Sequence, residues 1–341
     1  MAATAQTPEI FCAHGGKIAA ARAAFPDSRL PWIDLSTGIS PWSYPHEPLQ
    51  RADLTRLPDV QALADLEFAA ARYFRVGEAA RVIALPGSDL GLRLMGDRFA
   101  QRSVAVVRPG YSGHVLAWRG RTVTPIPAAD LRQAATTHDV IVLANPNNPD
   151  GRLIERQRLL ETAEELSGRT GTLVVDEAFA DLLPEHSVCN AVAEGLAVFR
   201  SFGKFFGLAG VRLGFLIVAA ALEREFRGGL GDWPLTGPAI VIGTAAYRDR
   251  AWQELQRKRL HSAAARLDAL LTEAGLTVVG GTALFRLVRH QGAGALFRRL
   301  AADSILTRPF TSDPALLRVG LPGDEADWER LAVALQGGHS P

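Results

Sequence analysis

The chain has 341 residues, more than the roughly 250–300 at which a single hydrophobic core stops growing, so we expect two packed domains. Hydrophobic residues make up 48% and charged residues 21%, proportions typical of a soluble globular protein, which exclude wholesale disorder. The formal net charge of +1 provides no basic footprint for nucleic acid or for an anionic membrane surface.

The numbers of lysine and cysteine residues limit the kinds of reactive site that the chain can form. Only three of the 37 basic residues are lysine, so a reaction that needs a primary amine has three candidates, Lys17, Lys204 and Lys258. Cys12 and Cys189 are the only cysteines, too few for a disulfide framework and without the spacing of metal ligands. The beginning of the chain lacks the apolar core of a signal peptide. We therefore expect a cytoplasmic protein without a structural metal.

The predicted elements start with an N-terminal segment, residues 1–45, which we expect to pack on a small domain. A large domain follows over residues 46–240, where β-branched runs alternate with amphipathic segments. We expect helices at 60–74, 89–100 and 156–167, and strands at 81–85, 103–107, 122–126, 139–144, 172–176, 197–200 and 213–218. Several of these strands are apolar on both faces, as parallel strands covered by helices are. The pattern predicts a three-layer α/β sandwich with a mostly parallel seven-stranded sheet.

Polar turns follow several of these strands. Pro86-Gly87-Ser88-Asp89 opens a helix, whose backbone N–H groups and positive dipole end suit a phosphate. Pro109-Gly110-Tyr111 offers an aromatic ring for stacking, and Asn145-Pro146-Asn147-Asn148-Pro149-Asp150-Gly151 offers amides. Asp176 ends the next strand, at the edge where α/β sheets bind ligands, and could keep a pyridine nitrogen protonated. The alternatives for Asp176 are a helix cap and a carboxylate on Mg²⁺. The Mg²⁺ alternative requires a Walker-type phosphate loop, which the sequence lacks.

The segment Ser201-Phe202-Gly203-Lys204-Phe205-Phe206 places a lysine among aromatic residues. Loss of hydration lowers the pKa of such a lysine, so a fraction of the side chains is present as the neutral amine. The neutral amine is the nucleophile that forms a Schiff base with an aldehyde cofactor. Arg212, eight residues further on, could hold a phosphate. The structural alternative is a lysine that reaches solvent from a turn.

The C-terminal third is expected to form a smaller α+β domain over residues 241–341. It follows a Gly- and Pro-rich break at residues 228–238. We expect a long charged helix at about 248–274, strands near 276–279 and 284–288, a helix, a strand at 316–319 and a last helix from Asp324.

Together, these motifs resemble the fold-type I, pyridoxal-phosphate-dependent aminotransferase superfamily over nearly the whole chain. The resemblance rests on an ordered set of residues: Gly87-Ser88, Tyr111, Asn148-Pro149-x-Gly151, Asp176, Ser201-x-x-Lys204 and Arg212. Four further segments are similar to a narrower group, the L-threonine O-phosphate decarboxylases of cobalamin biosynthesis, which is close to the histidinol-phosphate aminotransferases. These are His14-Gly15-Gly16, residues 34–41, Ile305-Leu306-Thr307-Arg308-Pro309-Phe310, and Leu317-Arg318-Val319-Gly320-Leu321-Pro322.

The resemblance implies a role for each matched residue. Lys204 would form the Schiff base with pyridoxal 5'-phosphate, Asp176 would pair with its pyridinium and Tyr111 would stack on its ring, which makes these three the catalytic residues. The implied cofactor site comprises Gly87, Ser88, Asp89, Tyr111, Asn148, Asp176, Ser201, Lys204 and Arg212. The implied substrate site comprises His14, Gly15, Gly38, Asn148, Arg308 on the phosphate, and Arg318 on the α-carboxylate.

Four positions depart from the superfamily pattern. Phe179 stands where many relatives have a tyrosine that donates to the phenolic oxygen of the cofactor, and Leu57 stands where a tyrosine reaches the partner subunit's cofactor phosphate. Gly203 replaces a common serine, and Gly38 replaces an asparagine that some decarboxylases place near the substrate. None of these changes removes a group that pyridoxal chemistry requires.

The implied activity is the decarboxylation of L-threonine O-phosphate to (R)-1-aminopropan-2-yl phosphate and CO₂, in a homodimer. An aminotransferase of the histidinol-phosphate type, acting on a phosphorylated amino substrate, is the alternative, because both reactions use the same cofactor residues. A pyridoxal-phosphate-binding regulator is a third possibility, but such regulators carry a DNA-binding domain for which this chain has no basic helix-turn-helix segment.

Overall fold

The computed structural model describes residues 9–28 and 30–337 and divides into two compact units. The large unit runs from Ser43 to Glu254, and the small unit combines Met1–Trp42 with Leu255–Pro341. The first eight residues, at the start of the chain where we expected no signal peptide, lie outside the described residues. The boundary expected between residues 240 and 241 falls inside helix α11 (Gly237–Arg248), so the large unit extends further along the chain than the sequence indicated.

Within the described part of the chain, the large unit contains the predicted seven-stranded sheet, in the order β2-β8-β7-β6-β5-β3-β4. Strand β8 is antiparallel to both of its neighbours, and all other pairs are parallel. The strands are β2 (Ala80–Leu85), β3 (Val104–Val107), β4 (Val123–Ile126), β5 (Val140–Ala144), β6 (Thr172–Asp176), β7 (Leu196–Ser201) and β8 (Gly214–Ala219). Every residue of β5 and β6 is buried, which explains why β5 is apolar throughout and β6 is apolar between Thr172 and Asp176.

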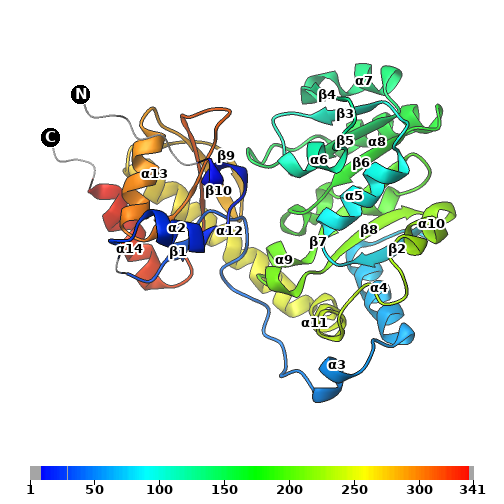
Figure 1. Ribbon diagram of the computed structural model, residues 1–341, viewed down its shortest axis with the longest axis horizontal. Coiled ribbons are helices and arrows are strands. Elements are labelled where there is room, and N and C mark those ends of the chain that lie inside the picture. Colours follow the sequence, from blue (N-terminus) through cyan, green and yellow to red (C-terminus); the bar gives the residue numbers. More distant parts are fainter. Residues whose placement is uncertain (1–8, 29, 338–341) are drawn as a thin grey trace. The chain divides into compact units, whose positions relative to one another are not determined.

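Helices cover both faces of this sheet, which confirms the predicted three-layer sandwich. Helices α5 (Ser88–Arg98) and α6 (Ser112–Ala117) lie on one face, and α4 (Val60–Phe74) and α8 (Arg156–Ser167) lie on the other (Figure 1). Side chains of α5 pack with Val174 and Phe199 of the sheet in one apolar cluster. The other α-helices described in this unit are α3 (Arg51–Thr55), α7 (Leu131–Thr137), α9 (Phe202–Phe205), α10 (Glu223–Gly228) and α11.

Helix α11 was not predicted, because Gly237-Pro238 reads as part of a loop. In the structure, Pro238 lies in the first turn of α11, where its missing N–H group is tolerated. Thr236 caps the helix by accepting a hydrogen bond from the backbone N–H of Ala239 at 3.3 Å. The long helix expected at about 248–274 is α12 (Arg250–Glu273).

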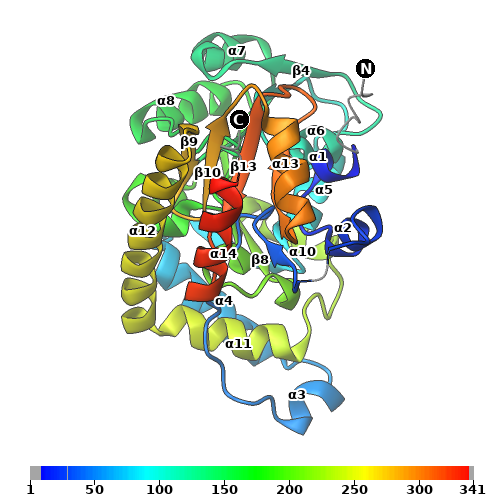
Figure 2. The ribbon, with the colours of Figure 1, turned by 90° about the vertical axis from the view of Figure 1, so that its left-hand side faces the viewer.

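The small unit has an antiparallel sheet in the order β12-β13-β10-β9 and a separate parallel pair, β1 with β11. Helix α13 packs against β11, β12, β13 and α14 (Figure 2). The strands are β1 (Ile33–Asp34), β9 (Thr277–Thr282), β10 (Phe285–Arg289), β11 (Ile305–Leu306), β12 (Arg308–Pro309) and β13 (Leu316–Gly320). The helices, besides most of α12, are α1 (Ile10–Ala13), α2 (Ile18–Ala24), α13 (Ala293–Ala302) and α14 (Glu325–Gln336). No helix among the described residues is long and apolar enough to cross a membrane.

Candidate active site

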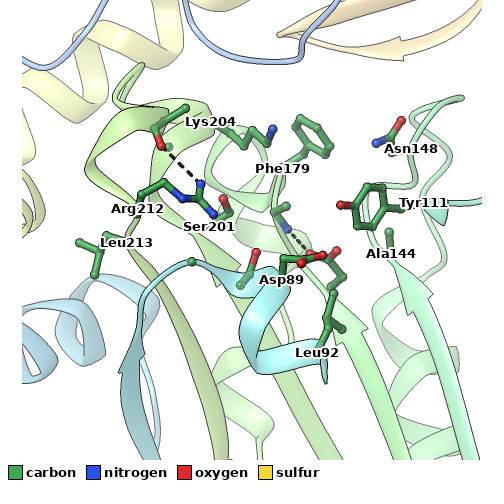
Figure 3. A pocket seen from close by; sticks show the side chains of 16 residues that line it. Asp89, Leu92, Tyr111, Ala144, Asn148, Phe179, Ser201, Lys204, Arg212 and Leu213 are labelled. Atoms are coloured by element: carbon green, nitrogen blue, oxygen red, sulfur yellow. Dashed lines mark hydrogen bonds between the residues drawn. The ribbon is translucent and has the colours of Figure 1, made fainter. Parts of the chain in front are cut away.

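A cavity of about 180 Å³ lies where the parallel strands of the large unit end (Figure 3). The turns after β2, β3, β5, β6 and β7 all reach this edge, and so does the segment before β8, because β8 runs in the opposite direction. All nine residues that the sequence predicts for a cofactor line the cavity: Gly87, Ser88, Asp89, Tyr111, Asn148, Asp176, Ser201, Lys204 and Arg212.

One side of the cavity is built to receive an anion. Helix α5 begins at Ser88, directly after β2, so the first N–H groups of the helix have no intrahelical acceptor. Gly87 has φ +91°, and a Cβ atom there would lie 2.6 Å from Arg212 Nη2, so glycine leaves the space that the guanidinium occupies. Ser201 and Arg212 lie together beside this turn (Figure 3). The carboxylate of Asp89 is held by Arg93 Nε at 3.1 Å, one turn along α5.

The lysine is presented by α9, which packs in an aromatic cluster. Phe202, Phe205 and Phe206 are buried, and the ring of Phe206 stacks on Trp252 with a centroid distance of 5.5 Å. These contacts fix the turn from which Lys204 extends into the cavity. A Cβ atom at position 203 would lie 2.6 Å from Ala209 Cα, which explains why glycine precedes the lysine in this chain.

Asp176 ends β6 and is held from two sides. Its Oδ1 accepts a hydrogen bond from the backbone N–H of Ala178 at 3.1 Å, and its Oδ2 lies 3.0 Å from His114 Nε2. His114 is fully buried in α6, and Tyr111 meets it edge-on with a centroid distance of 5.4 Å. The carboxylate is thus oriented before any ligand binds. His114 was not predicted from the sequence; its only sequence signal is the spacing of three residues after Tyr111, one turn along a helix.

Tyr111 and Asn148 line the side of the cavity opposite Ser201 and Arg212 (Figure 3). Phe179 lies between them and Lys204 in that view, and its ring brings no hydroxyl group to the cavity. The cavity therefore offers a lysine amine, a buried carboxylate, an aromatic ring and an anion-binding turn on separate elements. This combination suits a planar, phosphorylated cofactor with a basic ring nitrogen and a carbonyl group.

The other predicted substrate residues belong to the small unit, where the structure brings several of them together. Arg308 and Arg318 face each other on β12 and β13, and both are buried. Arg318 Nη2 donates to the carbonyl of Ser36 at 2.7 Å, and Arg308 Nη2 donates to the carbonyl of Ala13, which precedes His14, at 3.0 Å. Gly15 approaches Ser36 so closely that a Cβ atom there would lie 2.3 Å from the Ser36 carbonyl oxygen. Gly38 is buried two residues further along.

The two guanidinium groups affect each other's charge. Burial and, next in size, the positive charge of Arg308 lower the pKa of Arg318 to about 9, although Asp34 acts in the opposite sense. A second buried cation beside Arg318 is unfavourable unless an anion joins them. This part of the small unit is therefore suited to an anionic ligand.

Comparison with known proteins agrees with this geometry. The family model for aminotransferases of class I and II matches residues 44–335, which is most of the chain. The chain belongs to this family. Its large unit has the fold-type I architecture of the family, with the seven-stranded mixed, mostly parallel sheet described above.

Two members of the family are similar to the chain over nearly its whole length. The threonine-phosphate decarboxylase of Pseudomonas aeruginosa is 40% identical over 331 residues, which cover 96% of this chain and 98% of that protein. The threonine-phosphate decarboxylase of a Sinorhizobium species is also 40% identical, with 94% and 97% covered. Among solved structures, the histidinol-phosphate aminotransferase from Clostridium acetobutylicum superposes with a TM-score of 0.76 at 20% identity, with 84% of this chain and 91% of that chain covered.

Proposed function

We propose that the chain is a pyridoxal-phosphate-dependent threonine-phosphate decarboxylase. It would convert L-threonine O-phosphate to (R)-1-aminopropan-2-yl phosphate and CO₂, as a step of cobalamin biosynthesis. One observation carries the proposal: nine residues expected to hold this cofactor line a single cavity. The two relatives with 40% identity, both named threonine-phosphate decarboxylase, support the choice of reaction.

The cavity fits pyridoxal phosphate at both of its ends. The N–H groups of Ser88 and Asp89, with the side chains of Ser201 and Arg212, would bind the phosphate. The space left by the missing Cβ at Gly87 keeps Arg212 within reach of the same turn. At the other end, the carboxylate of Asp176 would bind the ring nitrogen, Tyr111 would stack on the ring, Asn148 would donate to the phenolic oxygen and Lys204 would hold the aldehyde carbon. When bound, the cofactor supplies a protonated ring that takes up the electron pair left by a broken bond to the substrate Cα.

The chain's own residues would then direct the protons. Asp176, oriented by His114 and by the N–H of Ala178, would hold a proton on the ring nitrogen of the cofactor, because a carboxylate favours a cation beside it. When the bond between Cα and the carboxylate breaks, CO₂ would leave and the electron pair of that bond would stay with the rest of the substrate. Lys204 Nζ would donate a proton to Cα and complete the reaction.

The substrate's two anions would bind to the small unit. Arg318 would take the α-carboxylate, and Arg308 with the His14-Gly15 turn would take the phosphate, with Gly38 contributing only its backbone. Holding both anions would fix the torsion about the bond between the substrate nitrogen and Cα, which decides which bond of Cα stands perpendicular to the cofactor ring; decarboxylation requires this of the Cα–carboxylate bond. This requirement distinguishes decarboxylation from transamination, which breaks the Cα–H bond instead.

The test is to incubate the pyridoxal-phosphate-loaded protein with L-threonine O-phosphate. Release of CO₂ without 2-oxoglutarate is the expected result. Formation of glutamate from 2-oxoglutarate, with no CO₂ released, would instead identify an aminotransferase of the histidinol-phosphate type. L-Threonine without its phosphate is the matched control, and we expect it to react far more slowly because it leaves Arg308 without its anion.

We also propose a homodimer, supported by an apolar surface on the large unit. Leu57, Val60 and Trp233 are 68%, 80% and 56% exposed, and Val60 and Trp233 line one shallow groove. Exposed apolar groups gathered in this way are typical of a protein interface. Trp233→Lys should convert the dimer to a monomer in sedimentation experiments, whereas Val279→Lys, on the small unit, should not.

A cytoplasmic location is part of the proposal, since Cys12 and Cys189 are both free.

A further inference from the structure

A buried ion-pair network adjoins the residues that end β6 and β7. Glu177 follows Asp176, and Arg200 precedes Ser201. Arg200 Nη1 donates to Glu177 Oε2 at 2.9 Å, and Arg200 Nη2 donates to Asp181 Oδ1 at 2.5 Å. All three side chains are at most 2% exposed. The proposed mechanism uses none of these groups, although two of them are next in sequence to cavity residues.

The network lies on the face of the sheet opposite the cavity-lining carboxylate. Asp176 pairs in register with Phe199, whose side chain packs toward α5. Because successive side chains of a strand point to opposite faces, Glu177 and Arg200 point away from α5. Consistently, the guanidinium of Arg200 lies over the ring of Phe74 in α4, 4.5 Å from its centroid.

The groups of the network have little freedom to move. Glu177 Oε1 accepts a hydrogen bond from the backbone N–H of Val188 at 2.7 Å, and its Oε2 accepts one from Ser187 Oγ at 2.6 Å. The backbone N–H of Glu177 also donates to the carbonyl of Phe199 at 2.8 Å. Burial by itself lowers the pKa of Arg200, but its neighbours, Asp181 first, raise it well above its ordinary value, so the group stays cationic. The two strand ends are therefore joined by side chains as well as by the backbone.

We infer that Arg200, Glu177 and Asp181 are positioning residues for the cofactor. They fix the spacing between Asp176, which would bind the ring nitrogen, and Ser201, which would bind the phosphate. A rigid cofactor with both groups requires that spacing, so a shift of either strand end weakens its binding. The inference rests on the proposed function, because it assumes pyridoxal phosphate as the ligand.

The experiment compares matched substitutions in two ion pairs. Asp181→Asn weakens the network but keeps an acceptor for Arg200. Asp268→Asn makes the same change in the small unit, where Asp268 Oδ2 pairs with Arg286 Nη2 at 2.8 Å. The dissociation constant for pyridoxal phosphate is measured with each apoprotein by absorbance titration, and thermal unfolding is recorded without cofactor. We expect Asp181→Asn to raise the dissociation constant about tenfold and Asp268→Asn to change it less than about twofold, with both melting temperatures lowered.

A second matched pair guards against a variant that fails to fold. Arg200→Lys keeps the charge but cannot bridge two carboxylates, so it should weaken cofactor binding at least as much as Asp181→Asn, whereas Arg286→Lys should not. The inference is overturned if Asp181→Asn binds pyridoxal phosphate like the wild type, or if Asp268→Asn weakens binding equally. If the wild-type apoprotein binds no pyridoxal phosphate, the proposed function fails instead.

Discussion

The cavity of the large unit and the arginine pair of the small unit manage charge in opposite ways. In the cavity, Lys204 and Arg212 share the lining with two carboxylates, and His114 lies within hydrogen-bond distance of the carboxylate of Asp176. In the small unit, two buried guanidinium groups face each other, and each donates to a backbone carbonyl. The cavity therefore contains both basic and acidic side chains, whereas the arginine pair brings together two positive charges.

Under the proposed function, the cavity would carry out the chemistry and the arginine pair would select the substrate. A site with oriented groups of both signs needs little rearrangement when a cofactor binds, so its residues should determine the rate. A pair of buried like charges is stabilised when an anion binds beside it, so its residues should mainly determine the affinity for the substrate. Four predictions can break or sharpen this contrast.

The largest effect is expected from Lys204→Ala, which would remove the proposed proton donor and the amine proposed to hold the cofactor. The rate of CO₂ release should fall by about 10⁴-fold or more, and the absorbance band of the bound cofactor should change. Lys258→Ala, at an exposed position of α12, is the control and should change the rate less than about twofold. A Lys204→Ala protein that kept the wild-type absorbance band would contradict the role assigned to this lysine.

Arg308→Gln should lower the affinity more than the rate, because the contact to the phosphate binds the substrate and also helps to orient it. Loss of a buried, charge-assisted contact to the phosphate should raise KM for L-threonine O-phosphate about 100-fold, with kcat changed only a few-fold. Steady-state kinetics separate the two constants. Arg289→Gln, which removes an exposed arginine paired with Asp313, is the control. A fall in kcat with an unchanged KM would show that Arg308 serves orientation alone and would contradict its assignment to substrate affinity.

His114→Phe tests whether the imidazole of His114 orients the carboxylate of Asp176. The substitution fills the space but leaves Asp176 Oδ2 without the imidazole, so kcat should fall about tenfold while KM changes little. The pH titration of the cofactor absorbance should shift as well, because a less fixed carboxylate holds the ring proton less firmly. His261→Phe, on the exposed side of α12, is the matched control. An unchanged titration would assign His114 to packing alone.

The smallest effect concerns pH. Since the pKa of Arg318 in the folded protein is lowered from 12.5 to about 9, the free protein loses this proton as the pH rises through about 9. The unfolded chain keeps the proton, so the cost of burying the charge is present below pH 9 and declines above it. Anion binding should show the opposite trend: the rise in melting temperature caused by sulfate, whose own charge does not change in this range, should be constant below about pH 8 and decline above about pH 9. A decline that persisted in Arg318→Gln would place its cause elsewhere.

Much of the large unit could be predicted because its signals are local. Strands such as Thr172–Asp176 are continuous apolar runs bounded by polar turns, and the cofactor residues follow those strands directly. The small unit was harder, since its short strands depend on distant partners. Ile33 pairs with Ile305, and a two-residue strand has no periodicity to detect before that partner is known.

The residues behind the site escaped prediction for a similar reason. His114 reaches Asp176 across 62 positions of sequence, and a single histidine on a helix does not indicate which carboxylate it meets. Arg200 and Glu177 lie inside recognisable motifs, yet only the pairing of β6 with β7 shows that their side chains meet. Motifs thus predicted what lines the cavity, and topology was needed to find what supports it.

The small unit is assembled from the two ends of the described chain, and this has a consequence for biosynthesis. Ser36, whose carbonyl accepts from Arg318, is made 282 residues earlier than its donor. At ribosomal rates this interval lasts roughly 15 to 55 s, during which the whole large unit emerges and can fold. The early segment that carries His14 and Ser36 must therefore wait, without its sheet partners, until translation is nearly complete. A chain released prematurely would carry a finished cofactor cavity and no folded arginine pair.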